Sequence, residues 1–196
     1  MTRIALIHAL ADSVPPINTA LARDWPDAQR MNLLDDSLSA DLARTGALDD
    51  AMTQRFITLG DYAVAHGADA LLFTCSAFGP CIAAVARRLA PRPVLRPNEA
   101  MVDAAVSAAA GGTIGLVASF APTLQSMPAE FPREQALHAA LADGALAALQ
   151  AGDGAAHDRL AAAAAVTLAR RGCSDVSSLG ICVPGSCAAA SRAPAR

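Results

Sequence analysis

The sequence predicts an α/β protein in which short parallel strands alternate with helices. Hydrophobic residues make up 54% of the 196 positions and charged residues 17%, so the chain can bury a substantial core. Continuous apolar runs, such as residues 69–74, are typical of strands that a parallel sheet buries on both faces. Segments with helical periodicity separate these runs, and this alternation indicates βαβ units.

The elements follow in order along the chain. The runs expected to form strands are residues 3–8, 30–36, 69–74, 92–97, 112–119 and 174–180. The segments expected to form helices are residues 13–25, 48–66, 81–90, 98–110, 121–127 and 142–171, the last with a break near 151–158. A proline-led start favours the first helix, and Gly67 follows the end of the second, where a glycine is common.

Composition argues against several classes of function. The net charge is −3 with no basic stripe, so nucleic acid is not an expected partner. No apolar run approaches the roughly 18 residues of a membrane span, and the first residues lack a signal-peptide pattern. We therefore expect no membrane association and a cytoplasmic location.

The cysteines and the glycine motifs bear on cofactors. The five cysteines are an odd number, and the cytosol is reducing, so a disulfide framework is not expected. No histidine or cysteine cluster has metal-ligand spacing, and neither a dinucleotide-binding nor a P-loop glycine pattern occurs. The prediction is that the protein uses no metal and no cofactor.

Cys75 is the main candidate for chemistry. It follows the apolar run 69–74, and small residues and a helix start come directly after it. Ligands of such sheets bind beyond the carboxyl ends of the strands. Free backbone N–H groups there are expected to lower the pKa of Cys75 and to hold a substrate carboxylate. The alternative is a buried structural cysteine.

The other loops at the same sheet edge offer further candidates, each with a structural alternative. His8 either caps the first strand or orients substrate and pairs with a thiolate. Asn98 and Glu99 either begin a helix, as N-cap and first-turn acid, or contact substrate. Ser119 and Thr123 either open a helix or bind polar groups of the substrate.

Several motifs together resemble the aspartate/glutamate/hydantoin racemase superfamily, to which arylmalonate decarboxylase and maleate isomerase are related. The motifs are "RIALIHALADSVPPI", "NLLDDSLSADL", "FTCSAFGP", "RPNEAM" and "GLVASFAPT". The resemblance implies two pseudo-symmetric Rossmann-like lobes, each a mostly parallel four-stranded sheet flanked by helices, with the active site in the cleft between them. It also implies catalysis without an organic cofactor or a metal.

The resemblance assigns roles to particular positions. Cys75 matches the first catalytic cysteine, and Ser76 and Ala77 match the positions that hold the carboxylate. The second-lobe loop matches Ser119, Phe120 and Thr123.

The expected lobes are residues 1–95 and 96–181, followed by an atypical tail, 182–196. The resemblance implies a second catalytic cysteine after the last strand of the second lobe, and Cys182 is near that place but shifted. Separately, 66–75 and 171–182 both run from a helix end through glycine, aspartate and strand to cysteine, with a spacing that differs by two residues, and this echo indicates two related βα lobes. The tail differs from the family pattern, and a frameshift or an altered terminus would produce such an ending.

The function expected from the resemblance is a cofactor-independent racemase or epimerase of an amino acid or an amino-acid derivative. Cys75 would transfer the α-proton while backbone amides hold the carboxylate. One alternative is a one-cysteine decarboxylase or cis–trans isomerase of a small carboxylic acid. Another is a non-catalytic or vestigial ligand-binding protein. The expected partner is a small carboxylic-acid or amino-acid-like substrate, and a homodimer is a candidate assembly.

Overall fold

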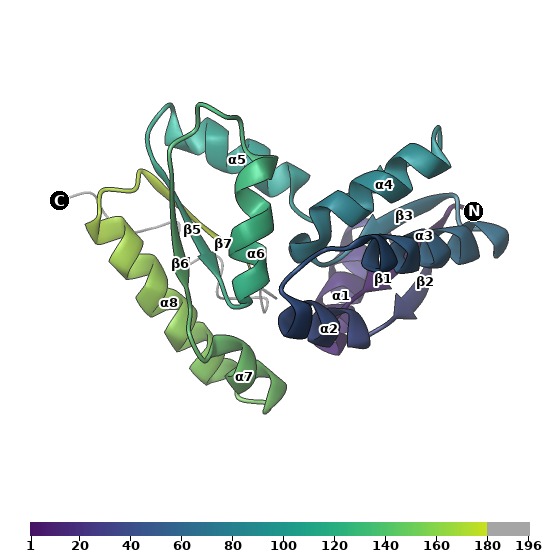
Figure 1. Ribbon diagram of the computed structural model, residues 1–196, viewed down its shortest axis with the longest axis horizontal. Coiled ribbons are helices and arrows are strands. Elements are labelled where there is room, and N and C mark those ends of the chain that lie inside the picture. The colour runs from purple at the N-terminus through teal and green to yellow at the C-terminus, as the bar shows by residue number, and fades with distance from the viewer. Residues whose placement is uncertain (180–196) are drawn as a thin grey trace. The chain divides into compact units, whose positions relative to one another are not determined.

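The structure, a computed structural model, describes residues 1–179 and shows two compact units (Figure 1). Unit 1 is Met1–Pro97, and unit 2 begins at Asn98. Each unit contains its own parallel sheet flanked by helices, which confirms the predicted α/β class. Cys182 and the rest of the tail lie outside the described residues.

The sheet of unit 1 has four parallel strands in the order β2-β1-β3-β4. Their bounds are β1 Arg3–His8, β2 Gln29–Leu34, β3 Ala70–Phe73 and β4 Val94–Leu95. In the register, Ile7 is opposite Phe73 and His8 is opposite Leu34. All strands therefore end at one edge of the sheet, and this edge receives His8 and the residues that follow Phe73.

Helices cover both faces of this sheet. They are α1 Val14–Asp24, α2 Ser37–Thr45, α3 Asp50–Ala65 and α4 Gly79–Leu89. On one face, Ile17 and Leu21 of α1 pack against Ile4 and Leu6 of β1. On the other face, Phe56 of α3 stacks on Phe73 with ring centroids 5.5 Å apart. The helix α2 was not predicted from the sequence.

The sheet of unit 2 has three parallel strands within residues 98–179, in the order β6-β5-β7. They are β5 Ile114–Ala118, β6 Leu137–Leu141 and β7 Asp175–Leu179. The sequence predicted four strands in this sheet, so the described part contains one fewer. It also did not predict β6, an edge strand whose residues are exposed or half-buried.

Within residues 98–179, four α-helices flank the sheet of unit 2. They are α5 Glu99–Ala109, α6 Ala121–Ser126, α7 Ala145–Gln150 and α8 Gly154–Arg170. The central strand β5 is buried on both faces: Leu116 packs in a cluster with Val102 of α5, and Val117 packs in another with Leu168 of α8. Among residues 1–179, no helix is long and apolar enough to cross a membrane.

The two sheets share a topology. In each, the first strand of the unit lies between the second and the third, so β5 corresponds to β1 and β7 corresponds to β3. The repeated sequence pattern at 66–75 and 171–182 therefore falls on equivalent strands. Cys75 follows β3, and Cys182 follows β7 along the chain.

Candidate functional site

Cys75 lies at the carboxyl edge of the unit 1 sheet, two residues after β3. Its backbone is extended, with φ −127° and ψ 120°, and a 3₁₀ turn, Ser76–Phe78, leads from it into α4. Cys75 as a whole residue is half-buried, and its thiol is desolvated. The backbone N–H of Ala77 donates a hydrogen bond to the sulfur, which places one amide of the turn at the thiol, as the sequence predicted for this loop.

A small cavity borders the thiol within unit 1. It leaves essentially no room for a water molecule, and it is lined by Ile7, His8, Ala9, Leu38, Phe56, Phe73 and Cys75. Most of the lining is apolar, and Leu38 and Phe56 come from α2 and α3. A thiolate in such surroundings would lose its hydration without gaining a cation.

The structure corrects the pKa that the sequence predicted for Cys75. Burial raises the pKa of this thiol from 9.0 to about 11, and the Ala77 N–H opposes the rise only in part. The sequence predicted a lowered pKa because it considered only the turn after Cys75. The apolar walls that raise the pKa come from distant segments, which the local sequence does not show. At neutral pH, the Cys75 thiol is therefore protonated.

His8 is fully buried, and both of its ring nitrogens have partners. Nδ1 is 2.8 Å from the Ser13 hydroxyl and 3.0 Å from the Thr74 hydroxyl, and Nε2 is 3.0 Å from Asn32 Oδ1. Burial lowers the pKa of His8, and the bond to Asn32 raises it by a smaller amount. His8 is therefore neutral at physiological pH and is engaged by these side chains rather than by a thiolate.

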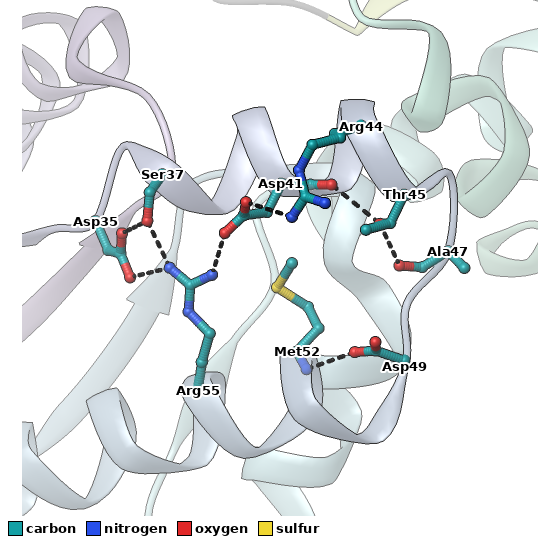
Figure 2. Close-up of polar contacts among 9 residues, drawn as sticks. All are labelled: Asp35, Ser37, Asp41, Arg44, Thr45, Ala47, Asp49, Met52 and Arg55. Atoms are coloured by element: carbon teal, nitrogen blue, oxygen red, sulfur yellow. Dashed lines mark hydrogen bonds and ion pairs between the residues drawn. The ribbon is translucent and has the colours of Figure 1, made fainter.

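An ion-pair network holds α2 beside the cavity (Figure 2). Arg55 of α3 reaches Asp35 at 2.6 Å and Asp41 of α2 at 2.7 Å, and it donates to the Ser37 hydroxyl at 2.6 Å. Burial alone would raise the pKa of Asp35, but hydrogen bonds from Ser37 and Arg55 bring it below its ordinary value. The network fixes α2 against α3, and α2 in turn places Leu38 in the cavity wall.

The second-lobe loop is at the carboxyl end of β5 in unit 2. Ser119 and Phe120 join β5 to α6 and are half-buried, and Thr123 is buried in the first turn of α6. Thr123 thus lies in the opening turn of a helix, as one of its two predicted roles required, whereas Ser119 precedes the N-cap residue, Phe120. Their role toward a substrate remains a proposal.

Asn98 and Glu99 are at the start of α5. Asn98 occupies the N-cap position, but its side chain makes no capping bond; it donates instead to Met127 Sδ at 3.1 Å. Glu99 is the acid in the first turn of the helix. Both residues occupy the positions that the structural alternative gave them, but the Asn98 side chain does not cap the helix.

Sequence reasoning missed several residues that build the site. Ser13, Asn32 and Thr74 surround His8, and Leu38 closes the cavity. The alternation of side chains along β1 and β3 is a signal that could have placed His8 and Thr74 on the same face of the sheet. Within residues 1–179, no group of three histidine, cysteine or acidic side chains could hold a metal ion.

Comparison with known proteins identifies the fold. No family model matches the chain, and no curated protein matches it. Among solved structures, a glutamate racemase isoform from Bacillus anthracis is similar, with 15% identity, a TM-score of 0.64 and coverage of 85% of this chain and 64% of that one.

A second solved structure supports the same assignment. It is a glutamate racemase from Francisella tularensis in complex with D-glutamate, with 14% identity, a TM-score of 0.57 and coverage of 77% and 57%. The chain thus spans less than two thirds of the length of each of these enzymes. At this identity, the likeness establishes a glutamate-racemase-like two-lobe fold, as the resemblance predicted.

Proposed function

We propose that the protein is a cofactor-independent racemase or epimerase of an amino acid or an amino-acid derivative. The observation that carries the proposal is the placement of Cys75. It follows β3, one of the two inner strands of the unit 1 sheet, and its sulfur accepts a hydrogen bond from the Ala77 N–H. The glutamate-racemase-like fold supports the same class of reaction.

The proposed chemistry needs a group for each face of the α-carbon. The protonated Cys75 donates a proton to one face of an enediolate, while a base on the opposite face removes the α-proton of the substrate. We assign this base to Cys182, because Cys182 follows the strand that corresponds to β3. Backbone amides at Ser76 and Ala77 are proposed to hold the carboxylate and to meet its developing charge.

A second candidate is a one-cysteine decarboxylase of a substituted malonate. The protonated state of Cys75 favours this candidate, since a thiol can deliver a proton to the enediolate that decarboxylation leaves. Loss of carbon dioxide leaves an enediolate, the Cys75 thiol protonates it, and water returns the proton to the sulfur. This path uses only one proton-transferring residue.

Product analysis separates these candidates. The full chain is incubated with enantiopure amino acids, hydantoins and substituted malonates, and the products are resolved by chiral chromatography. Racemisation or epimerisation supports the main proposal, whereas release of carbon dioxide with one product enantiomer supports the second. If none of these substrates reacts but one binds, as measured by calorimetry, the protein is a ligand-binding member of the fold and both enzymatic proposals are wrong.

A further inference from the structure

His8 links the carboxyl ends of the unit 1 strands on the face that α1 covers. Side chains alternate along β1, so His8 follows Ile4 and Leu6, which pack in the cluster under α1. Thr74 continues β3 on this face, where its hydroxyl meets His8, whereas Cys75 borders the cavity under α2 and α3. The side-chain alternation therefore directs the His8 ring and the Cys75 thiol to opposite faces of the same sheet edge, while His8 as a residue also borders the cavity.

A pair of asparagines determines the proton on Nε2 of His8. Asn18 Nδ2 donates to the Val14 carbonyl at 2.8 Å and to Asn32 Oδ1 at 2.7 Å. Asn32 Nδ2 in turn donates to Asn18 Oδ1 at 3.2 Å, so the two amides orient each other. The oxygen of Asn32 is an acceptor that faces Nε2 at 3.0 Å. Nε2 must therefore carry a hydrogen and donate it.

The hydroxyl groups determine the role of the other nitrogen. In the neutral ring, Nδ1 is then an acceptor. Ser13 donates its one hydroxyl proton to the Leu10 carbonyl at 2.7 Å, because a carbonyl oxygen only accepts. The Thr74 hydroxyl lies 3.0 Å from Nδ1, 3.1 Å from the Ser13 hydroxyl and 3.3 Å from the Ile7 carbonyl, to which it can also donate. Because the Ile7 contact is the longest of these and the Ser13 proton is engaged by Leu10, we assign the Thr74 hydroxyl as the donor to Nδ1.

We propose that His8 is a positioning residue, which fixes the Thr74–Cys75 segment through the Thr74 hydroxyl and keeps the thiol at the cavity. The inference rests on the proposed role of Cys75 in proton transfer. Both ring nitrogens are engaged within the protein, so His8 exchanges no proton with a substrate. The Thr74 backbone N–H already bonds the Ile7 carbonyl at 3.0 Å, and the side-chain bond adds a second fixed point directly before Cys75.

Four variants of the full chain test this role. Thr74→Val removes the hydroxyl with almost no change of shape, and His8→Leu removes the acceptor. His8→Asn keeps an acceptor near the position of Nδ1. The control, Leu6→Ala, weakens the same strand on the same face, since Leu6 is fully buried, but it leaves the hydrogen bonds intact.

Two readouts are taken on each variant. The rate at which iodoacetamide alkylates Cys75 at pH 8, followed by peptide mass spectrometry, reports thiol placement without requiring turnover. The kcat and KM of α-proton exchange report the effect on catalysis, using the acid that the wild-type chain turns over. We expect Thr74→Val and His8→Leu to change the alkylation rate about fivefold or more and to lower kcat about tenfold, with KM within about twofold.

The double variant of His8→Leu and Thr74→Val should be no worse than His8→Leu alone, because His8→Leu has already removed the hydrogen bond that Thr74→Val removes. His8→Asn and Leu6→Ala should remain within about twofold of wild type in both readouts. Unchanged alkylation in Thr74→Val, or an equal change in Leu6→Ala, would overturn the positioning role. If the wild type turns over no substrate but Thr74→Val and His8→Leu still change the alkylation rate of Cys75, the positioning role is supported and the proposed enzymatic function is contradicted.

Discussion

Leu38→Ala is expected to open the cavity beside Cys75 and to lower the pKa of its thiol. Leu38 is fully buried in α2 and forms part of the cavity wall. At pH 8, a thiol with a pKa of 9.0 is about 10% thiolate, whereas one with a pKa of about 11 is about 0.1% thiolate. Water that enters the enlarged cavity should return the pKa toward 9, so alkylation of Cys75 at pH 8 should become about 10–100-fold faster.

Leu42→Ala is the matched control for this prediction. Leu42 lies one turn further along α2 and is 2% exposed, but it does not line the cavity. Both variants should lose about 2–5 kcal/mol of unfolding free energy, measured by urea denaturation. The pH dependence of alkylation, followed on the Cys75 peptide between pH 7 and 10, should reach a plateau only in Leu38→Ala. A rate within twofold of wild type, or an equal acceleration in Leu42→Ala, would refute the assignment of the raised pKa to the cavity wall.

Two further variants test the helices that support the site. Asp49 accepts the Met52 N–H at 2.7 Å as the N-cap of α3, so Asp49→Ala should lower the unfolding free energy by about 1 kcal/mol in urea melts, and an unchanged midpoint would argue against the cap. In Gly60→Ala, the new Cβ would lie 2.8 Å from Val85 Cγ1 of α4, which should cost about 1–3 kcal/mol. Gly154→Ala, where nothing lies within 4 Å of the new carbon, should show no such loss in the same melts, and equal losses would contradict the packing explanation.

The sequence predicted those parts of the fold that local patterns determine. The strands β1 and β5 are buried on both faces, and β3 is buried on one face and half-buried on the other, so their apolar runs were visible. The strand β6 reads "LHAAL" and is exposed or half-buried at a sheet edge, so no comparable run marked it. The helix α2 has nine residues and only two large apolar ones, Leu38 and Leu42, so its apolar pattern is short. Arg55 of α3 also holds it through an ion pair with Asp41, and the sequence pattern does not show this contact.

The sequence predicted where Cys75 lies in the fold, but it did not predict the pKa of its thiol or the neutral state of His8. The strand-end placement of Cys75 follows from residues 69–79, which are adjacent in sequence. Its raised pKa depends on Leu38 and Phe56, which tertiary packing brings from other segments. Likewise, the partners of His8 come from β2, the start of α1 and the end of β3, so its engaged and neutral state could not be derived from the loop 8–13 alone.

The most direct test of the central claim is whether the proton that reaches the product α-carbon passes through Cys75. The chain is incubated with a reactive acid in deuterated water, and deuterium at the α-carbon is followed by NMR. We predict that wild type and Cys81→Ala incorporate solvent deuterium at similar rates, because Cys81 is buried within α4 and has no part in the chemistry. Cys75→Ser should fold normally and reduce the rate at least about 1,000-fold, since a hydroxyl is a far weaker acid than a thiol. Undiminished incorporation in folded Cys75→Ser would contradict the account.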